Sequence, residues 1–179
     1  MKRIVIICDF HKNSGFGHFT RMISLSKTFD KKLYNVTFLF EAKDKKFIQS
    51  YAKGINCKYL SFNLRKSSIQ IKKYLFKNLV DVVILDSYQI ELELEKELYK
   101  DFFLVCIDDK ISKHNSHIVF NSREGLNSNI LSKPGQKWFT GKKYILMNKT
   151  KKNIYLNRAS GYFNGLLGKP SWYRPNIKD

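Results

Sequence analysis

The chain has 179 residues and a formal net charge of +18, from 33 lysines and arginines against 15 acidic residues. This length suits one large domain or two small ones, and 43% apolar residues suffice for a sizeable core. The basic residues are mostly scattered lysines, with no basic stripe interleaved with aromatic rings, which argues against nucleic acid as a specific partner. A nonspecific affinity for polyanions or acidic membrane surfaces is expected instead.

The three cysteines, Cys8, Cys57 and Cys106, lie far apart and have neither an even count nor metal-ligand spacing. They are expected to be free, mostly buried thiols in a reducing compartment. The apolar run that follows Met-Lys-Arg at the N-terminus ends at Asp9, which is too early for a signal peptide. No later segment is long enough to span a membrane, so a cytoplasmic protein is expected.

Strand-like and helix-like segments alternate along the chain. The expected strands are 3–8, 36–40, 57–62, 81–86, 102–107 and 118–120, and the expected helices are 17–31, 45–53, 67–78 and 91–100. This alternation predicts right-handed βαβ crossovers and hence an α/β fold with a Rossmann-like, doubly wound parallel sheet. The sheet domain is expected to span residues 1–148, and residues 149–179 to form an irregular tail rich in glycine and aromatic residues.

The loop between the first strand and the first helix carries Gly15, Gly17 and His18. The glycines allow positive φ and leave room for a ligand close to the backbone, as in a phosphate-facing βα turn. A helix N-terminus favours anions and opposes protonation of a nearby imidazole, so His18 suits a general base beside a phosphate. The alternative is a glycine-rich turn with a helix-capping histidine.

Polar residues also stand where the predicted strands end. Because parallel sheets bind ligands at the carboxyl ends of their strands, these residues are expected to share one rim with His18. Together they predict a polar sugar or nucleotide pocket, although an aspartate at such a position often only caps a helix or satisfies loop amides. The residues are Asp9, Asp86, Tyr88, Asp108 and Asp109.

The remaining histidines carry weaker expectations. His11 and the neighbouring Lys12 precede the glycines and are expected to be exposed to solvent. His114 and His117 are three residues apart, but no third ligand with suitable spacing stands near them, so surface or turn histidines are expected rather than a metal site.

The order of these segments resembles the nucleotide-sugar hydrolase family of pseudaminic acid biosynthesis, PseG. That family removes UDP from a 2,4-diacetamido-2,4,6-trideoxy-L-altrose donor and is similar in architecture to the MurG-like glycosyltransferases of the GT-B fold. The resemblance extends over residues 3–147, and Ser87 stands where the family has a histidine. The matching segments are Asp9 with Gly15-Phe-Gly-His18 and Arg21, Val83-Ile-Leu-Asp86 with Tyr88, Val105-Cys-Ile-Asp-Asp109, Ile118-Val-Phe-Asn121, and Gly141 with Tyr144-Ile-Leu146.

The resemblance implies a mechanism in which His18 is the general base or the water-orienting group for displacement of UDP at the anomeric carbon, with no metal or other cofactor. It implies that Asp9, Asp86 and Tyr88 hold the sugar or orient His18, and that the Gly15 and Gly17 amides face the diphosphate. Further substrate contacts are implied for Phe16, Arg21, Asp108 and Asp109.

The second lobe of the GT-B fold, which binds uridine and diphosphate in these enzymes, has no counterpart in residues 149–179. Three interpretations therefore stay open. The chain is a PseG-like UDP-sugar hydrolase that is truncated or completed by a separate chain, half of a glycosyltransferase, or a non-catalytic remnant that binds without turnover.

Overall fold

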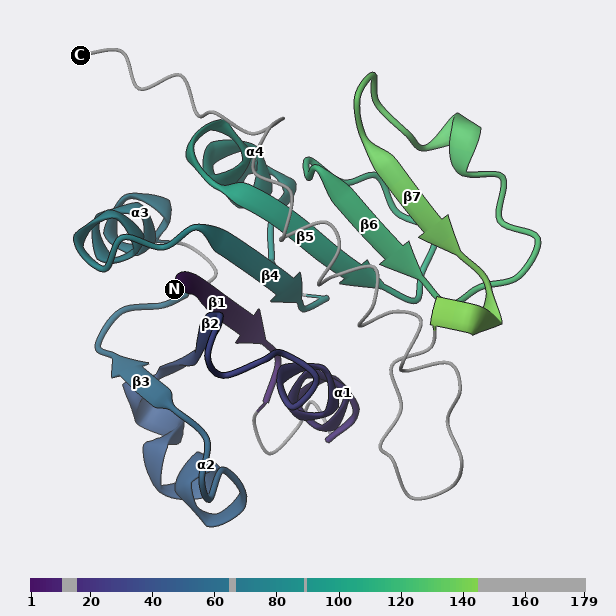
Figure 1. Cartoon of the computed structure of the whole chain (residues 1–179). Coiled ribbons are helices and arrows are strands. Elements are labelled where there is room, and N and C mark those ends of the chain that lie inside the picture. Colours follow the sequence, from purple (N-terminus) through teal and green to yellow (C-terminus); the bar gives the residue numbers. More distant parts are fainter. Residues whose placement is uncertain (11–15, 65–66, 89, 145–179) are drawn as a thin grey trace.

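The computed structural model describes residues 1–10, 16–64, 67–88 and 90–144. Within these ranges the chain folds into a seven-stranded sheet with α-helices on both faces (Figure 1). The strands are β1 (Lys2–Cys8), β2 (Tyr34–Glu41), β3 (Cys57–Leu60), β4 (Val82–Asp86), β5 (Phe103–Asp108), β6 (Ile118–Asn121) and β7 (Lys137–Thr140). The α-helices are α1 (Gly17–Ser26), α2 (Lys45–Tyr51), α3 (Ser68–Lys77) and α4 (Leu92–Asp101). Three short 3-10 helices, Ala42–Asp44, Ser128–Ile130 and Lys142–Tyr144, lie in the connections.

All neighbouring strands pair in parallel, in the order β3-β2-β1-β4-β5-β6-β7. The strands β2 and β3 are added on one side of β1, and the strands β4 to β7 are added on the other side. This reversal creates a switch point between β1 and β4, where adjacent connections leave for opposite faces and open a crevice. The doubly wound, Rossmann-like α/β fold predicted from the sequence is confirmed.

The central strands are apolar on both sides because both faces of the sheet are covered. Ile4 and Ile6 of β1 face a core that includes Phe19 of α1, whereas Val5 and Ile7 face a core with α3 and α4. Strand residues alternate between faces, so a continuous run of apolar residues is what a doubly covered strand requires. In Figure 1, α1 and α2 lie on one side of the sheet and α3 and α4 on the other.

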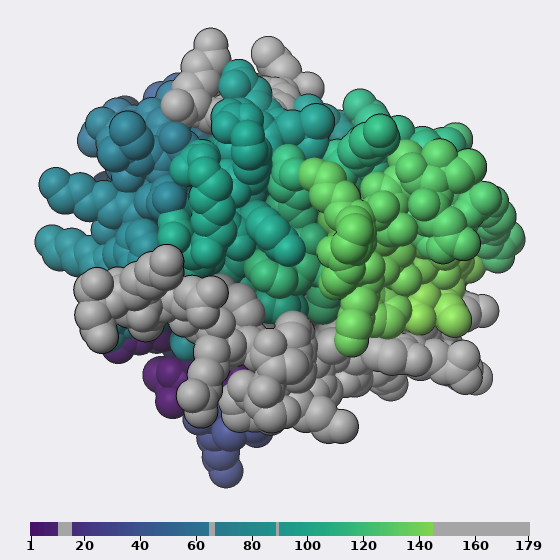
Figure 2. All heavy atoms as spheres, turned by 90° about the horizontal axis from the view of Figure 1, so that it is seen from above, coloured from purple at the N-terminus to yellow at the C-terminus, as the bar shows by residue number. Residues whose placement is uncertain are grey.

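The largest differences from the expected elements concern α1 and β7. Helix α1 ends at Ser26 rather than at residue 31, because the chain turns before β2 begins at Tyr34. Strand β7 was not expected, since its four residues are too short to show a periodic pattern. It pairs with β6 and forms one edge of the sheet. In Figure 2 the blue segment around α3 lies on one side of the molecule and the green segment that includes β7 lies towards the other.

The three cysteines are free, as expected, with Cys8 and Cys106 buried and Cys57 partly buried. In the part of the chain that the structure describes, no helix combines the length and the apolar character needed to cross a membrane.

Candidate active site

The polar residues expected at the strand ends meet at the switch point. Asp9 follows β1 directly, Asp86 is the last residue of β4, and the Asp9 amide donates to the Asp86 carbonyl at 3.1 Å. His18 and Arg21 lie on the first turns of α1, which starts beside the same strand ends. Three segments far apart in the sequence thus bring their polar side chains to one place because the parallel topology makes their ends coincide.

Asp86 is the centre of this cluster and is fully buried. Its Oδ1 lies 2.6 Å from Nδ1 of His18, and its Oδ2 accepts from Nε of Arg21 at 2.5 Å. A second Arg21 nitrogen, Nη2, donates to Oδ1, so the guanidinium holds the carboxylate in a fork. A buried carboxylate needs such a partner, because an unpaired charge in the interior is strongly destabilising.

The contact with Asp86 determines how the imidazole of His18 is presented. We assign the proton to Nδ1, which donates to the carboxylate, so that Nε2 is the basic atom of the neutral ring. Nη2 of Arg21 lies 3.0 Å from Nδ1 because both are donors to the same oxygen. The ring is nearly buried and meets Tyr88 edge to face at 4.5 Å between centroids.

Arg21 also bridges to Asp109, which follows β5. Its Nη1 donates to Oδ2 of Asp109 at 3.0 Å, and the Tyr88 hydroxyl donates to Oδ1 of the same carboxylate. Burial disfavours the charge of Asp109, but the Tyr88 and Arg21 hydrogen bonds more than offset this and lower its pKa. Burial and the bond to Asp109 raise the pKa of Tyr88 to about 12, and the two carboxylates raise that of Arg21 despite its burial.

The carboxylate of Asp9 contacts the segment after β4. Its carboxylate accepts from the Ser87 hydroxyl at 2.7 Å and from the Tyr88 amide at 3.0 Å, which fixes the turn that presents the Tyr88 ring. Ser87 was noted in the sequence only as a departure from the family pattern, and Lys110, which directly follows Asp109, was not singled out. Lys110 places its ammonium group 3.9 Å from the centre of the Tyr88 ring and adds a positive charge to the rim.

Asp108 does not join this cluster. Its carboxylate accepts from the Lys110 amide at 2.9 Å and the Ser112 hydroxyl at 3.2 Å, and it contacts Nε2 of His114 at 3.1 Å. These three contacts connect the Asp108 carboxylate to the loop after β5. The contact of Asp108 with substrate stays a prediction. His114 was expected to be a surface or turn histidine; it lies in the loop after β5, and its side chain is only 12% exposed.

The glycine loop is described only from Phe16 onward, so the expectations for His11, Lys12 and Gly15 fall outside the described residues. Gly17 is the first residue of α1 and does not use the positive φ that a glycine allows. Among the described residues, a Cβ at Gly17 would meet nothing within 4 Å. Phe16 is 45% exposed and packs its ring edge to face against Tyr51.

No protein family model and no curated protein matches the chain. Among solved structures, the crystal structure of Acinetobacter baumannii MurG superimposes with a TM-score of 0.57 at 11% sequence identity. The superposition covers 85% of this chain and 48% of the MurG chain. The fold is that of one GT-B lobe. At this identity the likeness concerns the fold alone, and the chain spans about half of the MurG structure.

Three residues of the polar cluster, Asp9, His18 and Asp86, are buried, whereas Tyr88 is 47% exposed. Next to the cluster, a cavity of about 30 Å³ that is lined in part by Asp9 and Ser87 has room for a single water molecule. A larger groove of about 630 Å³ lies elsewhere, between α1, α2 and the start of β2, and its lining includes none of the clustered residues.

Proposed function

We propose that the chain is the catalytic-base lobe of an enzyme that acts on nucleotide sugars, and that its reaction is the hydrolysis of a UDP-linked 2,4-diacetamido-2,4,6-trideoxyhexose. The observation that carries this proposal is the contact between His18 and the buried Asp86 at the switch point of the sheet. It is the arrangement of an oriented base: a carboxylate fixes the tautomer and leaves the opposite ring nitrogen to accept a proton.

In the proposed reaction, Nε2 of His18 takes a proton from a water molecule that attacks the anomeric carbon. The bond between that carbon and the phosphate oxygen breaks, and UDP leaves with its oxygen. The proton moves from water to His18, and Asp86 and Arg21 hold the ring in place during the transfer. Because the pyrophosphate is a good leaving group, positioning and one base of modest strength suffice, with no metal in the step.

The other expected residues are assigned to binding. Tyr88 and Asp109 stand beside His18 and offer a hydroxyl and a carboxylate for sugar hydroxyl or amide groups. The diphosphate is assigned to the N-terminus of α1 at Phe16 and Gly17, whose first turn carries no acidic residue, and to Lys110. Contacts to uridine would come from a second lobe, either in a separate chain or in sequence beyond these residues.

The test is UDP release from the diacetamido-trideoxyhexose nucleotide, measured with and without a candidate second lobe. His18→Gln should lower release by about 100-fold or more while circular dichroism is unchanged. Lys113→Ala, an exposed charge in the loop after β5, is the matched surface control and should leave release unaltered. Equal release by wild type and His18→Gln would refute the role of His18.

The alternative is half of a glycosyltransferase, favoured by the structural likeness to MurG. Isotope labelling separates the two reactions. In water enriched in oxygen-18, hydrolysis places the label on the anomeric carbon of the released sugar and none in UDP. A transferase releases UDP only when an acceptor sugar is added and incorporates no label. If UDP is not released under either condition, with the second lobe present, the chain is a non-catalytic binding module.

A further inference from the structure

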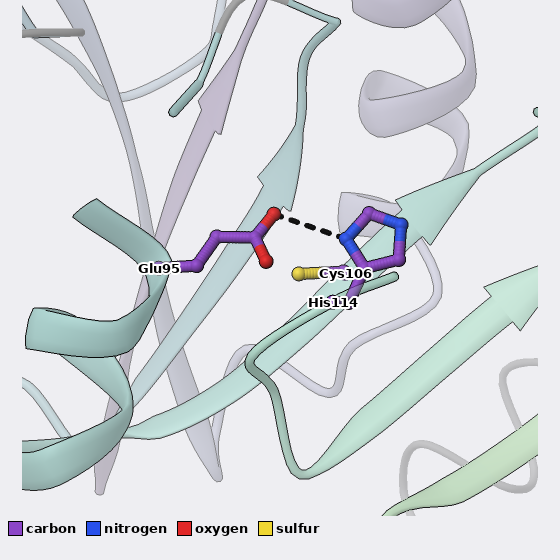
Figure 3. A group of neighbouring side chains, drawn as sticks. All are labelled: Glu95, Cys106 and His114. Carbon is purple, nitrogen blue, oxygen red and sulfur yellow. Dashed lines mark hydrogen bonds and ion pairs between the residues drawn. The ribbon is translucent and has the colours of Figure 1, made fainter. Parts of the chain in front are cut away.

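A second polar cluster lies behind the rim and takes no part in the proposed reaction. It joins Glu95 of α4, Cys106 of β5 and His114 of the loop after β5, and one ligand atom from each lies within 4.8 Å of the other two. Glu95 and Cys106 are 5% and 2% exposed, in the core between the sheet and the helices α3 and α4. Figure 3 shows the Cys106 sulfur between the Glu95 carboxylate and the His114 ring.

We propose that Glu95, Cys106 and His114 bind a divalent cation of the zinc class. A thiolate, an imidazole and a carboxylate are a donor set that suits Zn²⁺ or Co²⁺ and excludes Mg²⁺ and Ca²⁺, which take oxygen ligands. Sulfur and nitrogen ligands of tetrahedral zinc lie about 3.6 Å apart. The three observed ligand atoms lie within 4.8 Å of one another, and Nδ1 of His114 and Oε1 of Glu95 are 3.0 Å apart, so the observed distances bracket that spacing.

The surroundings of the cluster hold its ligands in the orientation that a metal requires. Nδ1 of His114 faces Glu95 at 3.0 Å, while Nε2 on the other side of the ring contacts Asp108 at 3.1 Å. A carboxylate on the far nitrogen of a histidine is the usual outer support of zinc-bound imidazole. The second oxygen of Glu95 accepts from the Asn115 amide at 2.8 Å, which leaves Oε1 for the cation.

The site would tie three elements together: α4, β5 and the loop that begins at Asp109. Because Asp109 is the next residue after the supporting Asp108, the cation would restrain the strand end from which Asp109 reaches Arg21. The role assigned to the ion is therefore structural, and it is independent of the hydrolase proposal.

The test is a titration of the tag-free, chelator-treated chain with Co²⁺, followed by displacement with Zn²⁺. Wild type should bind one ion per chain and show the near-ultraviolet charge-transfer band of a cobalt–thiolate bond. Cys106→Ser should lose this band and bind at least about 100-fold more weakly, and Cys57→Ser, the matched control, should behave as wild type. Asp108→Asn should keep the band with about 10- to 100-fold weaker binding.

Three results would overturn the proposal: no stoichiometric binding by wild type, a band that persists in Cys106→Ser, or a band lost in Cys57→Ser. If Cys106→Ser does not fold, Glu95→Gln replaces it, because it keeps the side-chain shape and removes one charged ligand. Unchanged cobalt affinity in folded Glu95→Gln would also contradict the assignment.

Discussion

Replacing Arg21 by methionine tests the ion pair that compensates Asp86, the most buried charge of the candidate active site. The substitution keeps an unbranched side chain out to the position of Nε but removes the guanidinium that holds Asp86. Asp86 is 0% exposed and keeps only the His18 contact among the side-chain partners described above. Loss of one partner of a buried ion pair costs about 3–5 kcal/mol, because the other charge is left uncompensated.

Each kcal/mol lowers the melting temperature of a domain of this size by roughly 2–4 °C, so Arg21→Met should melt about 6–20 °C below wild type. Urea unfolding followed by circular dichroism measures the free energy directly. Arg21→Met combined with Asp86→Leu removes both charges and should recover most of the loss. The reasoning is refuted if Arg21→Met alone lies within about 1 kcal/mol of wild type, or if the double variant is the less stable of the two.

Three further predictions concern stability and turnover. The pKa of His117 is lowered to about 4 by burial, and its Nδ1 accepts from the Leu104 amide, so an unfolded chain takes up the proton first as pH falls. The contribution of neutral His117 to the free energy of unfolding should thus be fully present above about pH 6.5 and decrease by about 1–2 kcal/mol towards pH 4, allowing for partial solvent screening. His117→Phe should flatten this part of the plot of unfolding free energy, measured in urea, against pH. Tyr88→Phe should lower UDP release by about tenfold or more with less than about 1 kcal/mol lost in urea unfolding, since it removes one exposed hydroxyl; a larger stability loss would assign Tyr88 to the fold. Phe19→Ala should cost about 3–5 kcal/mol, because the ring is 1% exposed, whereas the 45% exposed Phe16→Ala control should cost far less, and similar values for the two would contradict the packing described.

The sequence predicted the position of the candidate site better than the use of each residue in it. Asp9, Asp86 and Asp109 were expected at one rim because parallel strands end together, and the described geometry brings them there. The separate engagement of Asp108 was missed. Successive residues of a strand point to opposite faces, so two adjacent aspartates at a strand end serve different surroundings.

The second cluster had no sequence signal. His114 meets Glu95, which is 19 residues earlier on a helix, and Cys106 on the preceding strand, and no ligand spacing marks such a set. The expectation that no third ligand stands near His114 considered spacing along the chain, whereas tertiary packing supplies its neighbours. Gly17 likewise shows that a glycine allows a positive φ without requiring one.

The two outer strands of the sheet have a consequence for association. β3 and β7 are only four residues long, and each exposes a lysine, Lys58 and Lys137 respectively. Short edges with a charge offer a poor template for another strand to add to the ladder, which protects a sheet from edge-to-edge aggregation. Extension of the sheet by a strand of another chain is therefore not expected at β3 or β7.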